Sequence, residues 1–440
     1  MNKKKILEII KNQEVKFIKL EFTDIFGVMK NINISVDQLE KALNNEIMFD
    51  GSSIDGFARI EESDMYLYPD LDTFLVLPKA LTGKEREARF ICDVYTADGK
   101  PFAGDPRFIL KKVVKAAAEL GYQMNVGPEL EFFLFKLDTD GHPTLTPSDK
   151  ALYFDMDHLD TAHLAKKEMC LVLQDMGFKV EATHHECAPG QHEIDFKYEE
   201  ALKSADNIIT FKSVVKQIAQ NHGLYATFMP KPIYGIAGSG MHLNQSLAQN
   251  GINVFADPKD ELGLSKIAYY YIAGILNHAK GLSLLVSPQI NSYKRLVAGF
   301  EAPVNIAWAI RNRSPLIRVP SPRGESTRIE MRNPDPSCNP YLAIAGALAA
   351  GLDGIKKKEM PPKRIDGNIY ELSEKELTAQ HIETLPENLG EALEYMLQDE
   401  LIKKTLGQHI TERIASAAKE DWTQYRQLVT PYEVDKYLHL

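Results

Sequence analysis

Four glutamates stand in two short segments whose residue types suit the binding of hard metal ions. In the segment Gly127–Phe135, strand alternation sends Glu129 and Glu131 to one face and the apolar residues beside them to the other. In a segment that begins His-His-Glu and ends Gln-His-Glu, a Pro-Gly turn separates two strand-like pieces, so that Glu186 and Glu193 can approach each other across a hairpin. These patterns predict carboxylates gathered on one face of a sheet.

Two further segments add a fifth carboxylate and an imidazole. Glu330 lies in Arg-Ile-Glu-Met-Arg, where alternation puts all three charged residues on one strand face, and His242 follows Gly-Ser-Gly-Met. Five carboxylates and one imidazole without a thiolate form an oxygen-rich ligand set, which suits Mg²⁺ or Mn²⁺ better than structural zinc and suffices for two ions. Taken singly, each segment also fits exposed edge-strand glutamates or ordinary salt-bridge residues, and spacing alone does not show that the six side chains converge.

A cluster of arginines follows in the same half of the chain. Arginine pairs in a bidentate manner with carboxylates and phosphates, so this stretch predicts binding of a carboxylate substrate and a nucleotide polyphosphate. The sequence contains neither a P-loop nor a dinucleotide-binding glycine motif, so phosphate binding would depend on metal and arginine. We expect two or three of the seven to be surface residues that pair with acids elsewhere. The cluster comprises Arg295, Arg311, Arg313, Arg318, Arg323, Arg328 and Arg332.

Local signals predict the elements that must position these residues. Residues 16–35 have the pattern of a β-hairpin, and Asp105 with Pro106 has the pattern of a helix start, the helix ending at Gly121. Glycine and proline crowd just before that helix, which predicts a domain boundary giving domains 1–103 and 104–440. Further helices are expected near 160–176, 203–221, 264–280, 340–355 and 388–440, alternating with strands in an α/β or α+β body.

Composition narrows the class of protein. The 440 residues carry a net charge of -10, with 44% hydrophobic residues, so a folded globular protein is expected and partners such as nucleic acid or an anionic membrane are not. The four cysteines are scattered, which argues against a disulfide framework. No stretch approaches ~18 uninterrupted apolar residues, and no signal peptide is apparent, so the predicted location is the cytoplasm.

Together with Phe-Asp-Gly-Ser-Ser-Ile near residue 50, the metal-ligand and glycine motifs resemble those of type I glutamine synthetases in content and order. The resemblance spans the whole chain and favours the bacterial, feedback-inhibited, non-adenylylated subtype. It implies an α+β fold with a small N-terminal β-grasp domain and a large catalytic domain built on a curved antiparallel sheet and helices. It also implies a dodecamer of two stacked hexamers with active sites between subunits, and ATP-dependent ligation of ammonia to glutamate through γ-glutamyl phosphate.

The resemblance assigns roles position by position. It implies two Mg²⁺ or Mn²⁺ ions per site, one held by Glu131, Glu186 and Glu193 and the other by Glu129, His242 and Glu330. It gives Gly238, Arg295, Glu301, Arg313 and Arg332 to glutamate, and Glu181, Asn244, Ser246, Arg313 and Arg318 to ATP. An ammonium pocket is implied at Asp50, Ser53, Tyr153 and Glu186, with Asp50 as the base. Glu301 and Arg313 complete the implied catalytic set.

The resemblance also suggests how the activity is regulated. Arg59 corresponds to an arginine that senses glutamine, although a surface salt bridge is the plain alternative. Tyr370 lies where adenylylated members carry their modified tyrosine, but the segment is short, and we expect it to stay unmodified. Ala237 departs from the usual asparagine and predicts weaker glutamate binding.

Two other functions are compatible with these motifs. A γ-glutamyl ligase that uses an organic amine would share the ATP, metal and glutamate parts, and the ammonium-pocket residues argue against it. A nitrogen-sensing protein that binds a transcription regulator is the other alternative. As a second role, such a regulator remains a possible partner of the enzyme.

Overall fold

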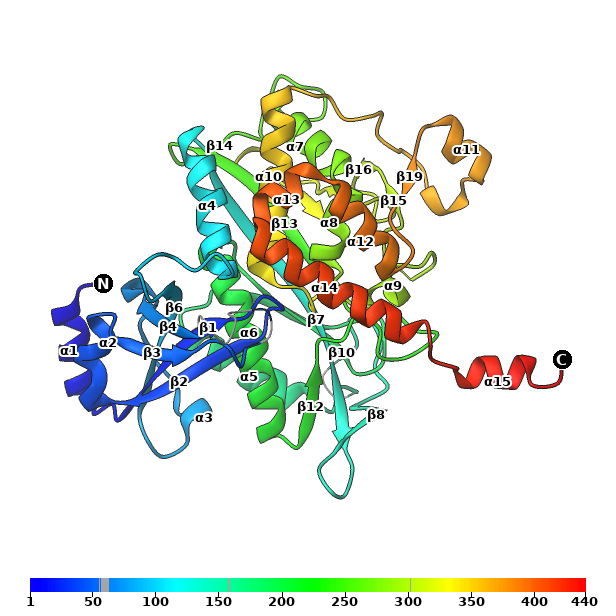
Figure 1. Ribbon diagram of the computed structural model, residues 1–440. Helices are drawn as coiled ribbons and strands as arrows, with labels where there is room; N and C mark the ends of the chain where they lie inside the picture. Colours follow the sequence, from blue (N-terminus) through cyan, green and yellow to red (C-terminus); the bar gives the residue numbers. More distant parts are fainter. Residues whose placement is uncertain (55, 57–62, 157–158, 301) are drawn as a thin grey trace.

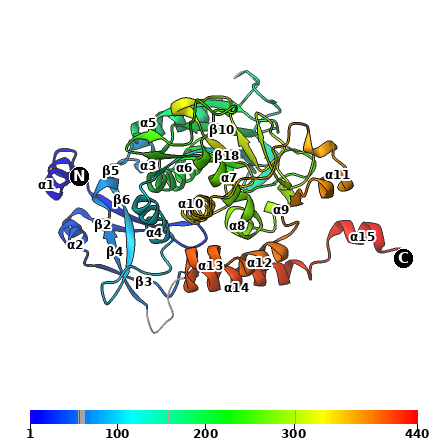
Figure 2. The same cartoon turned by 90° about the horizontal axis from the view of Figure 1, so that it is seen from above.

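The computed structural model describes residues 1–54, 56, 63–156, 159–300 and 302–440. An N-terminal domain and a larger α/β body lie side by side, and the C-terminal helices run along the body (Figures 1 and 2). Each part has its own hydrophobic core. The boundary near residue 103 stays a prediction, which this separation of the cores supports.

The N-terminal domain is built on a sheet with the strand order β2-β1-β6-β4-β3, and β5 (Leu75–Val76) pairs with β6. β1 is antiparallel to β2 and parallel to β6, which is the mixed arrangement expected of a β-grasp domain. The strands are β1 (Phe17–Thr23), β2 (Met29–Ser35), β3 (Ile47–Asp50), β4 (Asp64–Pro69) and β6 (Glu87–Thr96). The predicted hairpin at 16–35 is confirmed.

Two helices cover this sheet, and one of them was not predicted. Helix α1 (Lys3–Asn12) buries only Ile6 and Ile10 among lysines, so its apolar stripe is narrow in the sequence. Helix α2 (Leu39–Leu43) follows β2 and buries Leu39, Ala42 and Leu43. The buried residues of both helices join one core with β1 residues Ile18 and Leu20.

The larger body is organised around β7 (Gln123–Leu137), the central strand of a sheet with the order β16-β17-β18-β13-β7-β10-β9. All its pairings are antiparallel except the edge pair of β16 and β17, which is parallel. Its other strands are β9 (Val180–His185), β10 (Gln191–Phe196), β13 (Met241–Gln249), β16 (Trp308–Ile310), β17 (Ile317–Val319) and β18 (Ile329–Met331). Short strands β8 (Pro143–Pro147), β11 (Glu199–Glu200) and β12 (Leu224–Thr227) pair with β7, and β14 (Ile252–Asn253) with β13.

Helices cover the apolar face of this sheet. Leu130, Phe132 and Leu134 of β7 are fully buried in the same core as α4 and α6 residues. That leaves the opposite face of β7, with Glu129 and Glu131, for polar chemistry. The helices are α4 (Pro106–Glu119), α5 (His163–Asp175), α6 (Ala201–Asn221), α7 (Lys266–Asn277), α8 (Ala279–Val286), the short α9 (Ser292–Arg295) and α10 (Pro340–Lys357).

Local signals predicted most of these helices. Asp105 caps α4, because its side chain accepts a hydrogen bond from the Arg107 backbone at 2.9 Å, and Gly121 just past the helix has φ +83°. The helix expected at 264–280 is two helices, because the chain breaks at His278 between α7 and α8.

The expected C-terminal helical region is four helices, namely α12 (Leu389–Gln398), α13 (Glu400–Leu406), α14 (Gln408–Tyr425) and α15 (Pro431–Tyr437). The last of them projects from the body in both views (Figures 1 and 2). No helix in the described part of the chain has the length and apolar character needed to cross a bilayer.

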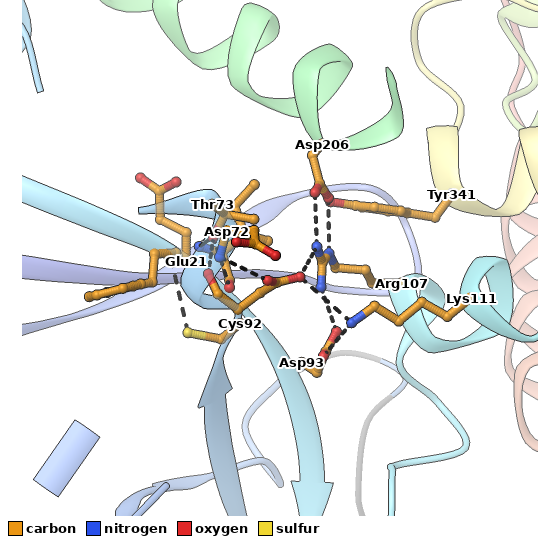
Figure 3. A network of polar contacts seen from close by, with 12 residues as sticks. Glu21, Asp72, Thr73, Cys92, Asp93, Arg107, Lys111, Asp206 and Tyr341 are labelled. Carbon is orange, nitrogen blue, oxygen red and sulfur yellow. Dashed lines mark hydrogen bonds and ion pairs between the residues drawn. The ribbon is translucent and has the colours of Figure 1, made fainter. Parts of the chain in front are cut away.

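A buried ion-pair network joins the two parts of the molecule (Figure 3). The Arg107 guanidinium of α4 contacts Asp70 at 2.8 Å and Asp93 at 2.7 Å, both from the N-terminal domain, and Asp206 of α6 at 2.9 Å. Asp206 also accepts a hydrogen bond from the Tyr341 hydroxyl at 2.7 Å. One arginine therefore fixes how the N-terminal domain docks on the helices behind the sheet.

Candidate active site

The register of the sheet brings the predicted metal ligands together. Glu131 of β7 pairs with Glu193 of β10, and Glu129 pairs with His242 of β13. Directly opposite residues in a strand pair project to the same face, about 5 Å apart. Residues more than a hundred positions apart in the sequence thus share one patch of the sheet.

The first cluster consists of Glu131, Glu186 and Glu193, whose carboxylate oxygens all lie within 4.8 Å of one another. Glu186 comes from the hairpin that connects β9 to β10, so it reaches the pair from the side. Burial and then the neighbouring Glu186 charge raise the pKa of Glu131 to about 8. Burial and then the charges of Asp195, Glu131 and Glu129 raise the pKa of Glu193 well above its usual range.

Such mutual repulsion between carboxylates is relieved by a cation. One buried and two half-buried carboxylates that lie this close together form the oxygen donor set that Mg²⁺, Mn²⁺ or Ca²⁺ prefers. The residues present therefore fit a divalent cation here.

The second cluster is Glu129, His242 and Glu330. The His242 Nδ1 atom lies 3.2 Å from Glu129 and 3.5 Å from Glu330. Burial and then the Arg332 charge lower the pKa of His242, so the ring is neutral at neutral pH and keeps one nitrogen lone pair. Burial opposes ionisation of Glu129, but hydrogen bonds from His242 and Asn244 outweigh it and lower the pKa of Glu129 to about 2.

Arginines hold Glu330 in place. Arg332 Nη1 donates to one of its carboxylate oxygens at 2.6 Å, and Arg318 Nε donates to the other. Both oxygens of this fully buried carboxylate are therefore engaged by guanidinium groups. A cation next to Glu330 would share its charge with two guanidiniums, which favours weaker binding there than in the first cluster.

Three residues that the sequence interpretation missed support these clusters. Gln191 Nε2 donates to Glu131 at 2.9 Å and to the Gly238 carbonyl at 3.1 Å, which links a ligand to the glycine loop. His184 Nε2 lies 2.7 Å from Glu186, and Asp195 groups with His184 and Glu193. His184 and Gln191 belong to the His-His-Glu and Gln-His-Glu motifs, and Asp195 follows two residues later. Strand alternation, which puts every second residue on the site face, could have predicted them.

The glycine motif 238–240 permits a close approach of Arg295. A Cβ at Gly240 would lie 2.6 Å from Arg295 Nη2, and one at Gly238 would lie 2.3 Å from the Pro230 carbonyl oxygen. Arg295 is buried and donates to the carbonyls of Asn333 and Arg332 at 2.9 and 3.1 Å. It forms no ion pair with another described residue, so its charge is available to an anion.

The other arginines divide into three groups. Arg328 Nε donates to Asn244 at 3.0 Å, so Arg328 joins Arg318 and Arg332 on the ligand face. Arg323 instead donates a hydrogen bond to the Leu262 carbonyl at 2.6 Å. This contact holds a loop in place, so the role of Arg323 is structural. Arg311 and Arg313 are exposed on the loop before β17.

The residues predicted for the nucleotide lie along the same face. Asn244 Nδ2 donates to Glu129 at 2.9 Å, and Ser246 is two residues further along β13, on the same side. Glu181 of β9 lies between the paired residues Ala182 and Val180, where the register shifts. A bulge of this kind changes the direction of a side chain. Glu181 can therefore lie near Asp195, although regular alternation would put it on the opposite face.

The predicted ammonium pocket is divided between two distant places in this chain. The Tyr153 ring meets His184 at a centroid distance of 5.7 Å, beside Glu186. Asp50 is at the end of β3 in the other domain, where its carboxylate accepts hydrogen bonds from Ser52, and Ser53 is exposed next to it. Both views show β3 away from β10 (Figures 1 and 2). A single chain does not bring these residues together.

Two predicted site residues, Glu301 and Arg59, lie outside the described residues. Tyr370 is half-buried, and its hydroxyl donates to the Ala302 carbonyl at 2.8 Å. Ala237 is half-buried against the apolar cluster of Phe133 and Phe135.

A β-grasp domain followed by a sheet that carries two oxygen-rich clusters, with arginines beside them, defines a metal-dependent enzyme acting on anionic substrates. Residues 103–437 match the family model "Glutamine synthetase, catalytic domain", and residues 14–97 match "Glutamine synthetase, beta-Grasp domain". The chain belongs to the glutamine synthetase family. Its activity is the ATP-dependent ligation of ammonia to L-glutamate, which gives L-glutamine.

Individual relatives agree over the full length. A glutamine synthetase of Clostridium saccharobutylicum is 55% identical over 99% of this chain and 98% of its own, and one of Staphylococcus aureus is 53% identical with the same coverage. Among solved structures, a "GmaS/ADP complex" superposes with a TM-score of 0.89 at 32% identity, covering 99% of each chain. A Plasmodium falciparum glutamine synthetase superposes with a TM-score of 0.88 at 27% identity, again over 99% of each chain. The relatives that are named glutamine synthetase do not favour an organic-amine ligase or a sensor without turnover.

Proposed function

We propose that the two carboxylate clusters would hold two divalent cations, Mg²⁺ or Mn²⁺, at the site where ATP phosphorylates glutamate. The observation that carries this proposal is the pairing of Glu131 with Glu193 and of Glu129 with His242 on neighbouring positions of one sheet face. When bound, such cations neutralise charge on the transferred phosphoryl group and polarise its oxygens.

The chain's own residues orient the substrates. Arg295, buried without an ion-pair partner among the described residues, would receive a carboxylate of glutamate, with Gly238 and Arg332 beside it. Asn244, Ser246, Glu181 and Arg318 would line the nucleotide. The ADP of the related "GmaS/ADP complex" supports a nucleotide as a ligand of this fold.

The first step joins glutamate to phosphate. A γ-carboxylate oxygen of glutamate attacks the γ-phosphorus of ATP, the bond between that phosphorus and the bridging oxygen breaks, and ADP leaves. Arg313 and Arg318 would lie on the outer side of the transferred group and offset its developing charge. Water must be kept out at this stage, because γ-glutamyl phosphate is readily hydrolysed.

The second step consumes ammonium. Asp50 takes a proton from ammonium held with Ser53, Tyr153 and Glu186. The resulting ammonia attacks the γ-carbon, and the carbon–oxygen bond to phosphate breaks. Glu301 is our candidate for accepting the second proton, and its role rests on the resemblance alone.

We further infer that the site is shared between subunits of a cytoplasmic dodecamer. The separation of Asp50 from Tyr153 and Glu186 in one chain supports this, because a neighbouring copy would have to supply Asp50. Feedback by glutamine through Arg59, an unmodified Tyr370 and the binding of a nitrogen-responsive regulator remain predictions.

Phosphate release from ATP, measured with glutamate and Mg²⁺ while the acceptor is varied, tests the proposal. We expect release to require ammonium and to match glutamine formation one for one, with putrescine and ethylamine giving only background. Release with an organic amine alone would overturn the assigned acceptor pocket.

A pair of variants tests the metal face. Glu131→Gln should abolish synthesis and remove one class of Mn²⁺ sites from a binding isotherm. Asp140→Asn is the matched control, because Asp140 also belongs to an acidic cluster, with Asp138 and His142, but that cluster is fully exposed. Equal Mn²⁺ binding by both variants would refute the site.

A further inference from the structure

A charged layer is buried behind the hairpin that carries Glu186. Strand alternation puts His184 and Glu193 on the site face, so the adjacent pair of His185 and His192 projects to the opposite face, towards α5. Both rings are buried, and they meet edge to face at 4.8 Å. The carboxylates of Asp149 and Asp160 and the ammonium group of Lys166 complete the layer.

His185 is the centre of this layer. Its Nε2 atom lies 2.9 Å from Asp149 Oδ1, and its Nδ1 atom lies 2.7 Å from the backbone carbonyl of Glu186. Its own carbonyl accepts a hydrogen bond from the Phe154 backbone at 3.1 Å. His185 therefore contacts both Glu186 and Phe154, the immediate neighbour of Tyr153. Glu186 and Tyr153 are the two residues of the predicted ammonium pocket that lie together in this chain.

Asp149 fixes the same hairpin from its other end. Its Oδ1 atom accepts hydrogen bonds from Gly190 at 3.0 Å and Ala151 at 3.2 Å, in addition to the contact with His185. Gly190 has φ +70°, and a Cβ there would lie 2.9 Å from the Leu134 carbonyl oxygen, so the turn has little freedom. The hairpin is thus held at both ends by one carboxylate.

Ordinary packing does not explain so polar a layer. Buried ionic groups contribute little net stability compared with apolar side chains of the same size. Neither ring nitrogen of His192 has a hydrogen-bond partner among the described residues, which adds a further cost. The arrangement is costly for stability but specific in geometry.

A metal ion is a poor occupant for this layer, although Asp149, His185 and His192 lie within ligand distance of one another. Asp149 Oδ1 already accepts from several donors, and Lys166 Nζ lies 2.6 Å from Asp160 on the other side of His192. A cation would displace those bonds and meet a buried ammonium group.

We propose that His185, held by Asp149, is a positioning residue that sets the place of Glu186 relative to Tyr153, and so shapes the part of the ammonium pocket within this chain. The inference rests on the proposed roles of Glu186 and Tyr153. Outer contacts of this kind typically change activity or metal affinity about 10- to 100-fold when they are removed.

The test uses the full-length enzyme with Asp149→Asn and a matched control, Asp399→Asn. Asp399 is the control because it also contacts a half-buried histidine, His278, at 2.7 Å and accepts hydrogen bonds from two backbone N–H groups, but it lies among the C-terminal helices. We expect Asp149→Asn to lower kcat/KM for ammonium about 10- to 100-fold while KM for ATP stays within about 2-fold. Phosphate release should also exceed glutamine formation, because a misplaced acceptor leaves γ-glutamyl phosphate to water.

His185→Gln provides a second variant, since its amide nitrogen can replace Nε2 towards Asp149 but leaves no donor at the position of Nδ1, which contacts the Glu186 carbonyl. If Asp149→Asn does not fold, the same selective loss is expected of His185→Gln. An equal fall in all kinetic constants, or kinetics matching those of Asp399→Asn, would overturn the inference. Failure of the wild-type enzyme to use ammonium would instead overturn the proposed function, so the two failures are distinguishable.

Discussion

Replacing Arg107 tests how the N-terminal domain is held on the catalytic body. Its side chain is only 3% exposed and touches three carboxylates, of which Asp206 receives two parallel hydrogen bonds at 2.9 Å (Figure 3). Arg107→Met keeps most of the volume but leaves Asp206 without its ion-pair partner, while Asp70 and Asp93 retain only Lys111. Removing one partner of a buried ion pair costs about 3–5 kcal/mol, and we expect a loss of that size.

Lys111→Met is the matched control. Lys111 lies in the same helix and contacts Asp93 at 2.5 Å, but its side chain is 33% exposed, so its removal should cost about 0–1 kcal/mol. Urea unfolding at matched subunit concentration compares the two, because the stability of an oligomer depends on protomer concentration. Adding Asp206→Asn to Arg107→Met should recover part of the loss, since one orphaned charge is removed. The reasoning is refuted if Arg107→Met costs no more than Lys111→Met.

Three further predictions concern single positions. Asp50→Ala should lower ammonia-dependent turnover about 10²- to 10⁴-fold while ATP binding, followed by calorimetry, stays intact; lost ATP binding would contradict the placement of Asp50. Burial and then the charge of Asp93 raise the pKa of Asp105 to about 7, so the folded protein keeps a proton that the unfolded chain releases above pH ~4. Stability should therefore fall as pH rises from ~4 to ~7 and then level off, and urea midpoints of Asp105→Asn should show a flatter slope; an unchanged slope would assign the dependence to other groups. Gly190→Ala should destabilise by ~1–3 kcal/mol because of its positive φ, and an unchanged unfolding midpoint would show that the turn relaxes.

The sequence predicted best those elements whose pattern lies entirely within one short segment. The Asp105 cap with Pro106, the 16–35 hairpin and the alternation around Glu129 and Glu131 each depend on neighbours within a few residues, and the structure has each of these elements. The meeting of Glu129 with His242 depends on strand register between segments 113 residues apart. Periodicity says which face a side chain takes but not which strand lies alongside.

Residues behind the site were missed for a related reason. His185 and His192 belong to the motifs used to find the metal ligands, yet alternation sends them to the other face, where their partners come from the distant Asp149 and α5. Helix α1 was missed because two buried isoleucines among lysines give a weak periodic signal. Both failures concern tertiary partners that local patterns do not specify.

The residues of the two metal clusters and the other predicted site residues lie on different kinds of structural element. Five of the six metal-cluster residues lie on β7, β10, β13 and β18, where backbone pairing sets their spacing. This pairing holds the carboxylates in place against the mutual repulsion that contributes to the raised pKa of Glu131 and Glu193. Repelling carboxylates on loops would move apart, whereas strands in the middle of a sheet are held by hydrogen bonds on both sides. Tyr153 and Arg313, by contrast, lie on loops, and Asp50 lies where a strand ends. Phosphoryl transfer requires charged groups with fixed positions, and the strands of the sheet meet that requirement. The acceptor and the acyl phosphate must instead be enclosed one after the other, and the residues predicted to contact them lie on loops and at a strand end.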